Sequence, residues 1–181
     1  PIQNYSISVT ANKDKFNTSI VMGYHRQDGV IHNSNFERYS FRANNDYQVN
    51  DRLKLGLNLA PSIQIRNNQN SDGGWQIISS SFLADPTVSP YDDNGDLRLS
   101  LNSPGMFPQP NWIRVLKEKT SKTQEVVLLG TAFAELGIWK GLKYKFQAGL
   151  DLTSSNFRGF APSTIGGGMF TAPPQKAVGE Y

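Results

Sequence analysis

The chain has 181 residues, of which 38% are hydrophobic and 18% charged, and its mean hydropathy is −0.46. This composition leaves no room for a transmembrane helix, but it is compatible with membrane strands, which are apolar on one side only. The absence of cysteine excludes disulfides and cysteine metal sites. The net charge of +3 is small and the charges are scattered, so no nucleic-acid-binding surface is expected.

Alternation of apolar and polar residues begins near the N-terminus. It covers residues 5–11 and again 16–24, with Thr18 and Val21 as exceptions in the second run. Successive side chains of a strand point to opposite sides, so this pattern predicts strands. We expect the first strand at about 2–11 and the second at 16–24.

Two longer alternating segments follow, at 38–49 and 53–65, and Asn50 and Asp51 supply turn chemistry between them. Only Asn45 interrupts the apolar row of the first segment. The pattern predicts a hairpin with one apolar and one polar face. Both strands are about twice the common length of five or six residues. Each is long enough to cross a bilayer as a tilted strand, which takes roughly 9–11 residues.

Residues 66–121 lose the alternation and are rich in Asn, Ser, Gly, Pro and Asp. Within them, 75–83 has apolar residues at helical spacing after a possible cap at Asp72, and 111–118 begins with the capping residue Asn111. These features predict one or two short helices. A connection of this length predicts a functional loop.

Strand patterns return at 122–135 and 142–153. The first of these is apolar on both faces in its middle, whereas the second alternates sharply. The remaining residues, 154–181, are rich in Gly, Pro and Ser without a period, and we expect a loop or tail there.

The six predicted strands are joined by short, long, short, very long and short connections, as in outer-membrane barrels. Aromatic residues gather towards the two ends of the strands, as in the girdles of such barrels. Those near the short turns are Phe16, Tyr47, Trp139 and Tyr144, and those near the long loops are Tyr5, Tyr24 and Tyr39. The predicted fold is all-β, an antiparallel meander of about six long strands from a large transmembrane β-barrel, with long extracellular loops carrying the short helices.

Six strands are fewer than the eight of the smallest membrane barrels, and open sheet edges are not stable in lipid. Either the chain is part of a larger barrel, or its apolar faces pack on each other. The second case corresponds to a soluble β-sandwich, for instance a carbohydrate-binding module. An enzyme on a small outer-membrane barrel is a weaker alternative.

Three segments resemble a known family. They are MGYHRQDGVIHNSNFERYSFRANNDYQVNDRLKLGLNL, LADPTVSPYDDNGDLRL and GLKYKFQAGLDL. Their order, spacing and motifs resemble the barrel of SusC/RagA-type TonB-dependent outer-membrane transporters of Bacteroidota. The resemblance covers most of residues 5–155, and its first segment is fairly specific.

The resemblance implies a 22-stranded barrel with an N-terminal plug, energised by TonB, in the outer membrane of a Gram-negative bacterium. It further implies import of a glycan or peptide oligomer and a SusD-like surface lipoprotein as partner. We see no plug, TonB box, signal sequence or terminal barrel strand, so we expect 1–181 to be an internal barrel fragment in contact with the lipid bilayer. An isolated fragment is expected to self-associate through its apolar faces.

Two groups of residues are candidates for ligand contact. Aromatic side chains in the long loop can stack on sugar rings or anchor the loop's own core, and these are Trp75, Tyr91 and Trp112. Polar residues of the alternating strands are expected to face the lumen, where they line a passage or pair with one another or with the plug. They are Arg42, Asn44, Asp46, Lys54, Asn58, Lys143, Lys145 and Asp151.

Other motifs carry no chemistry. His25 and His32 lie seven residues apart in a predicted loop, without a third ligand at metal-site spacing. The acidic run that starts at Asp92 has Gly95 at position four and Asn102 at position twelve, which does not match an EF-hand loop. No nucleophile and base can be paired, so we expect no enzyme activity, metal or cofactor.

Overall fold

The computed structural model describes residues 1–69, 77–101, 103–105, 109–165 and 178–180. They fall into two compact units. The first, here called the sheet unit, comprises Pro1–Asp28, Phe36–Ile65 and Gln124–Ser155. The second, here called the loop unit, comprises Gly29–Asn35, Arg66–Thr123 and Asn156–Tyr181.

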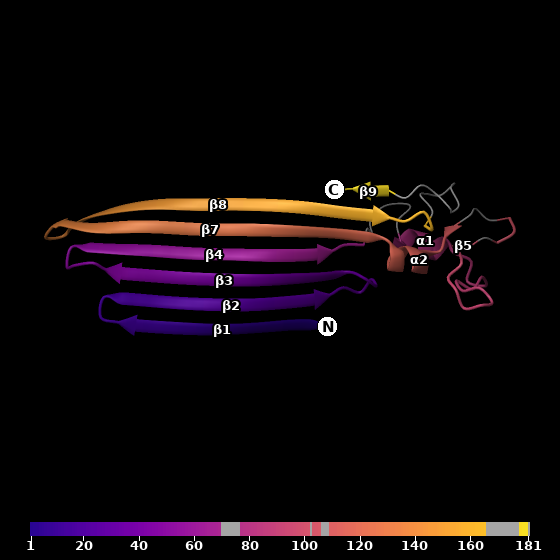
Figure 1. Cartoon of the computed structure of the whole chain (residues 1–181), viewed down its shortest axis with the longest axis horizontal. Coiled ribbons are helices and arrows are strands. Elements are labelled where there is room, and N and C mark those ends of the chain that lie inside the picture. Colours follow the sequence, from indigo (N-terminus) through magenta and orange to yellow (C-terminus); the bar gives the residue numbers. More distant parts are fainter. Residues whose placement is uncertain (70–76, 102, 106–108, 166–177, 181) are drawn as a thin grey trace. The chain divides into compact units, whose positions relative to one another are not determined.

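The long strands form a single sheet in which neighbouring arrows run in opposite directions (Figure 1). The strands are β1 Ile2–Lys13, β2 Phe16–Asp28, β3 Asn35–Gln48, β4 Leu53–Asn67, β7 Thr120–Trp139, β8 Leu142–Ala161 and β9 Val178–Glu180. Their order is β1-β2-β3-β4-β7-β8-β9, so each long strand pairs with the one before it in sequence. The predicted antiparallel meander of six long strands is therefore confirmed.

Three tight turns connect the strands at one end. Asp14, with a φ of 44°, lies between β1 and β2, and Gly141, with a φ of 84°, lies between β7 and β8. Between β3 and β4 the side-chain oxygen of Asn50 accepts hydrogen bonds from the backbone N–H groups of Arg52 and Leu53, both at 2.9 Å. Asn50 therefore forms the local turn that its side chain favours.

The sheet unit has almost no hydrophobic core, because the sheet is a single layer. Of its apolar side chains only Ala43 is buried, whereas Ile7 is 71% exposed and Phe146 60% exposed. Most of the exposed apolar side chains follow the alternation of the strands and lie on one face, here called the apolar face, whereas Leu129 is an exception that lines a hollow on the other face. A β-sandwich would require a second sheet against this face, and the described residues contain only a two-stranded sheet besides the long one.

The apolar face carries aromatic pairs near both ends of the β2–β3 hairpin. The rings of Tyr24 and Tyr39 lie 5.0 Å apart between centroids, and those of Phe16 and Tyr47 lie 6.5 Å apart. On β1, the ring of Tyr5 stacks on Tyr24 at 6.3 Å. Aromatic side chains thus gather at the predicted ends of the strands, as in an interfacial girdle.

The two polar exceptions of the apolar rows contact each other. The hydroxyl of Thr18 on β2 donates a hydrogen bond to the side-chain oxygen of Asn45 on β3. This pair follows the same register as the Phe16–Tyr47 pair beside it. Each polar group is thereby satisfied by the other, which lowers the cost of placing both on an apolar surface.

The remaining described elements belong to the loop unit and are short. Helix α1 covers Ile77–Leu83, helix α2 covers Trp112–Glu118, and strands β5 Ser100–Leu101 and β6 Gln109–Pro110 pair with each other. The prediction of one or two short helices in the long loop is confirmed. The predicted cap at Asp72 lies outside the described residues. With seven residues each, neither described helix could span a membrane.

The strands extend further than their sequence patterns indicated. Strand β8 continues to Ala161 and β9 pairs with it, with Phe160 opposite Gly179, although we expected a loop or tail from 154 onward. Strand β2 continues to Asp28, which places His25 in a strand rather than in a loop. The ladder continues there because cross-strand contacts replace hydrophobic alternation, among them the ion pair of Arg26 with Glu37 at 3.1 Å.

Gly56 of β4 allows close packing across the strands. A Cβ atom at this position would lie 2.0 Å from the Phe133 ring of β7. We predict that Gly56→Ala forces the ring to move and lowers the free energy of unfolding by about 1 kcal/mol, as expected for overpacking. Guanidinium unfolding in detergent, followed by tryptophan fluorescence, measures this difference.

Gly149→Ala is the matched control, because a Cβ there has 3.7 Å to its nearest neighbour, Thr131. Equal effects of the two substitutions would show that the Phe133 contact does not constrain the sheet.

Candidate functional site

The face opposite the apolar side chains, here called the polar face, is where β3, β4, β7 and β8 bring charged and amide side chains together. Several of the charges pair across strands. The ammonium group of Lys54 lies 2.9 Å from the Asp46 carboxylate, and that of Lys143 lies 2.8 Å from Glu135. Pairs of this kind at solvent-exposed sites contribute little stability. They do show that the charges of Lys54 and Lys143 are each paired with a carboxylate on the same face.

The ring of Phe133 lies among these pairs. The ammonium group of Lys145 is 4.6 Å from the ring centroid and that of Lys54 is 5.8 Å from it. Both distances allow a cation–π interaction, which contributes about 0.5–1 kcal/mol at an exposed site. An aromatic ring on a polar face is unusual, and the absence of a side chain at Gly56 provides the space for it.

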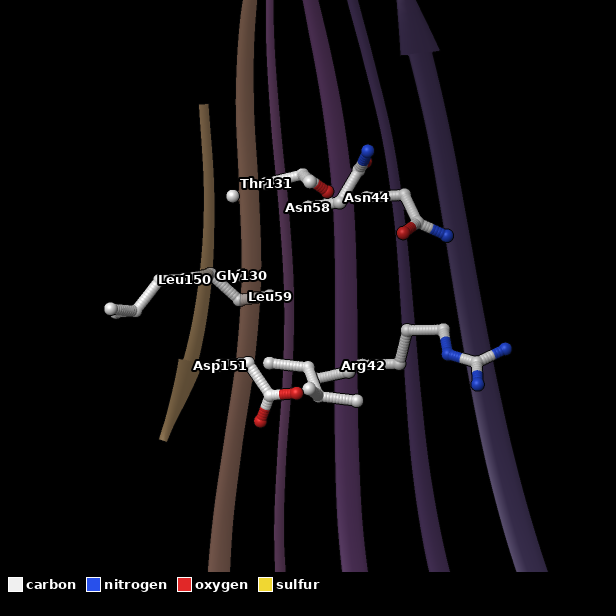
Figure 2. A pocket seen from close by; sticks show the side chains of 11 residues that line it. Arg42, Asn44, Asn58, Leu59, Gly130, Thr131, Leu150 and Asp151 are labelled. Carbon is white, nitrogen blue, oxygen red and sulfur yellow. The ribbon is translucent and has the colours of Figure 1, made fainter. Parts of the chain in front are cut away.

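A hollow of about 400 Å³ lies beside these pairs on the polar face (Figure 2). Its polar side chains come from four neighbouring strands, and they are Arg42, Asn44, Asn58, Thr131 and Asp151. Asn44, Asn58 and Thr131 lie at one level along the strands, and Arg42 and Asp151 lie at another, on opposite sides of the hollow (Figure 2). The Arg42 guanidinium points away from the Asp151 carboxylate, so the two charges do not pair with each other.

The polar side chains of this hollow have no hydrogen-bonding or ionic partner within the part of the chain that the structure describes. This distinguishes them from Lys54, Lys143 and their carboxylate partners on the same face. A second hollow, of about 390 Å³, extends towards β1 and β2 and shares Asn44 and Asn58 with the first. The two hollows therefore form a continuous polar surface.

All eight residues predicted to face a lumen lie on these strands. Seven of them either line one of the two hollows or contact a residue that does, so they share the polar face. The eighth, Lys143, joins the same face through Glu135. Whether this face lines a lumen remains a prediction. Sequence reasoning missed Thr131, Phe133 and Glu135, because β7 is apolar on both faces and its alternation gave no clear inward side.

The loop unit is organised around Asn111, whose side chain is 1% exposed. Its amide nitrogen donates to the backbone oxygens of Pro90 and Arg98, at 2.8 and 2.9 Å. Its side-chain oxygen accepts from the N–H of Ile113 at 3.2 Å, which caps α2 as predicted from the sequence. One side chain thus fixes a helix start and both ends of the segment 90–98.

The two described aromatic candidates adjoin this arrangement in the sequence, because Tyr91 follows Pro90 and Trp112 follows Asn111. Tyr91 forms an isolated β-bridge with Leu97 and is 40% exposed, and Trp112 is the first residue of α2 and partly buried. The described residues show no ring contact between the two. The third candidate, Trp75, lies outside the described residues. A role for these aromatics in ligand contact remains a prediction.

The motifs that we set aside as sites have structural roles. The carboxylate of Asp92 accepts hydrogen bonds from the N–H groups of Asn94 and Asp96, which closes a local turn. His25 packs its ring against Phe36 at 6.0 Å between centroids. Among the described residues, no three His, Asp or Glu side chains are grouped as metal ligands.

Comparison with known proteins identifies related barrels. The chain is 26% identical over 170 residues to TonB-dependent receptor P3 of Formosa agariphila, a match that covers 91% of this chain and 17% of the receptor. The structure of the RagAB peptide transporter matches with a TM-score of 0.73 and 27% identity, over 89% of this chain and 18% of that one. The resemblance to SusC/RagA-type TonB-dependent receptors is confirmed.

Further matches agree with this receptor resemblance. TonB-dependent receptor P26 of the same organism is 27% identical over 95 residues, which is 52% of this chain and 9% of the receptor. The RagAB peptide importer in its 'closed-closed' state matches with a TM-score of 0.74 and 26% identity, over 94% of this chain and 19% of that one. No protein-family model matches the chain. The chain therefore spans less than a fifth of the receptors that it resembles.

We predict that Asn111→Ala loosens residues 90–98 of the loop unit. The substitution removes a helix cap, which costs about 0.5–2 kcal/mol. It also leaves the backbone oxygens of Pro90 and Arg98 without their donor. Hydrogen exchange of residues 90–98 should accelerate by about tenfold or more, while exchange in the long strands stays unchanged.

Asn94→Ala is the control for this experiment, because only the backbone N–H of Asn94 takes part in the turn with Asp92. Equal acceleration in both variants would show that Asn111 does not organise the segment.

Asp85 makes the loop unit sensitive to acid. Hydrogen bonds from the Ser103 hydroxyl at 2.5 Å, and from the hydroxyl and N–H of Thr87, lower the pKa of Asp85 below its ordinary value of 3.8. Because the folded pKa is lower than the unfolded one, the stabilisation is present above about pH 4 and is lost as the pH falls through the folded pKa. Asp85→Asn should therefore accelerate cleavage by pepsin near residues 85–103 at pH 5.

As the pH falls through the lowered pKa of Asp85, the difference between wild type and Asp85→Asn should shrink, because the wild-type carboxylate then becomes protonated. A difference that stays the same as the pH is lowered would mean that charge on Asp85 does not hold the loop.

Proposed function

We propose that this chain forms part of the wall and extracellular loop surface of a TonB-dependent outer-membrane transporter that imports a nutrient oligomer, either a peptide or a glycan. The observation that carries the proposal is the single-layer sheet of long strands, apolar and exposed on one face and polar on the other. In water such an apolar face is unfavourable. In a bilayer it contacts lipid tails while the opposite face contacts water.

The sheet order supports a wall rather than a complete barrel. The described order starts at β1 and ends at β9 without returning to β1. A barrel in lipid has no free edges, because unpaired backbone groups are costly there. In the proposed transporter, further strands pair with the outer edge of β1 and with the part of the β8 edge that β9 leaves open. An isolated chain would satisfy these edges and its apolar face by self-association.

Several partners follow from the proposal. The lipid bilayer covers the apolar face, a TonB complex supplies energy, and a SusD-like surface lipoprotein assembles above the loops. The structurally similar RagAB is a peptide transporter, which favours a peptide among the possible substrates. The matched proteins are named as receptors and transporters, and we propose no enzymatic activity.

The proposed membrane orientation predicts a difference between adjacent residues of one strand. In β4, Leu57 is on the apolar face and 44% exposed, whereas Asn58 is on the polar face beside the hollow. After Leu57→Cys and Asn58→Cys, in separate proteins reconstituted in lipid, a polar maleimide should label only the second. A thiol in hydrocarbon has neither water nor reagent around it.

Ile7→Cys and Ser8→Cys on β1 form a second matched pair, with the same expected order of labelling. Denaturation in urea should make all four thiols equally reactive, which controls for the reagent. Similar labelling of Leu57→Cys and Asn58→Cys in lipid would overturn the proposed membrane wall. Transport itself is tested by comparing uptake of labelled peptide and oligosaccharide mixtures by cells with and without the gene.

A further inference from the structure

The three tight turns at one end of the sheet carry more cationic than anionic side chains. They connect β1 to β2, β3 to β4, and β7 to β8 (Figure 1). In and next to these turns the cations are Lys13, Lys15, Arg52 and Lys140, and the anions are Asp14 and Asp51. All six side chains are exposed. This end of the sheet, here called the turn end, therefore has an excess of positive charge.

The cations of the turn end have no anionic partner of their own. None of the four forms an ion pair among the described residues. The ammonium group of Lys15 donates to the backbone oxygen of Val49 at 3.4 Å, which leaves its charge uncompensated. In contrast, Lys54 and Lys143 on the polar face are paired with carboxylates at 2.9 and 2.8 Å. The charges of the turn end are therefore available to an external anion.

These cations adjoin the aromatic side chains at the end of the apolar face. Lys13 continues the apolar row of β1 and lies opposite Phe16 in the ladder, and the ring of Phe16 lies 6.5 Å from that of Tyr47. Trp139, which is 80% exposed, directly precedes Lys140. Aromatic side chains of membrane proteins gather at the level of the lipid headgroups, and long cationic side chains extend their charges into that layer.

The spacing of the turns allows their charges to act together. In the strand order β1-β2-β3-β4-β7-β8, each turn is two strands away from the next, which corresponds to roughly 10 Å. This separation is about one Debye length at 0.1 M salt. A layer of anions beside the turn end therefore interacts with all three turns. Each lysine or arginine near an anionic membrane surface favours association by about fivefold.

We propose that the turn end binds the headgroups of anionic phospholipids, with their phosphate groups beside the cations and their acyl chains along the apolar face. The proposal rests on the proposed function, because it places the apolar face in a bilayer, and it names the lipid that the membrane wall selects. A zwitterionic headgroup carries its own cation beside the phosphate and gains less from these charges. An acidic soluble protein has no acyl chains for the adjoining apolar face.

The test uses Trp139 as a reporter in the full transporter. The protein is reconstituted in vesicles of equal amounts of phosphatidylcholine and phosphatidylglycerol, with bromine, which quenches tryptophan on contact, on the acyl chains of one lipid or the other. Subtracting the emission of a Trp139→Phe variant isolates the reporter. We expect phosphatidylglycerol to associate beside Trp139 about fivefold more strongly than phosphatidylcholine. Equal association of the two lipids would overturn the proposal.

Removal of the neighbouring charge tests whether the preference is electrostatic. Lys140→Gln should lower it to about twofold or less, whereas Lys140→Arg should retain it. In 1 M salt the wild-type preference should disappear, because the Debye length is then about 3 Å. Lys122→Gln is the matched control, because it removes an exposed lysine at the other end of β7 and should leave the preference unchanged. A preference that survives both Lys140→Gln and high salt would contradict the proposal.

A second reporter tests the turn between β1 and β2. Phe16→Trp in the Trp139→Phe protein places a tryptophan opposite Lys13. Lys13→Gln should then lower the preference for phosphatidylglycerol more than Lys140→Gln does, because the β7–β8 turn is farther from this reporter. Equal effects of the two substitutions would show that the cations do not act at their own turns.

Failure of this proposal is distinguishable from failure of the proposed membrane wall. The cysteine labelling of Leu57→Cys and Asn58→Cys does not depend on headgroup charge. If labelling differs as expected while both lipids quench equally or neither quenches, the wall stands and the headgroup site is wrong. If the two cysteines label alike, the wall is wrong and the headgroup site fails with it.

Discussion

The structure of the sheet unit depends on one constraint, which follows from its being a single layer of long strands. Its backbone groups must form hydrogen bonds with neighbouring strands, and its two faces must contact two different environments. Ala43 is its only buried hydrophobic side chain among the described residues, so packing against a core cannot stabilise it. Stability comes instead from the backbone ladder and from whatever covers the apolar face. Lipid satisfies this second requirement without a facing sheet.

Departures from alternation fit the same constraint, because each is compensated locally. Thr18 and Asn45 place polar groups on the apolar face and bond to each other. Phe133 places an aromatic ring on the polar face, where Gly56 makes room for it and Lys145 approaches it. A sequence rule that treats each residue alone sees these positions as exceptions, whereas pairing across strands makes them consistent.

The sequence was sufficient for the strands, the turn at Asn50 and the cap at Asn111, because periodicity and side-chain capping are local properties. It was insufficient where pairing rather than hydrophobicity extends a strand, as in β2 up to Asp28 and β8 up to Ala161. Nor could it assemble the hollow, whose residues Arg42 and Asp151 are separated by the long loop between β4 and β7. These two residues line the same hollow only because of the order of the strands in the sheet, and a local sequence pattern does not predict that order.

The loop unit follows a different principle from the sheet. Its buried side chains include Leu101, Leu116 and Ile165 together with Asn111, so it has a small core of its own. Asn111 connects that core to the segment 90–98 through backbone oxygens rather than through the side chains of the segment. The side chains of this segment can therefore change without loss of its conformation, as is common in loops that a rigid scaffold positions.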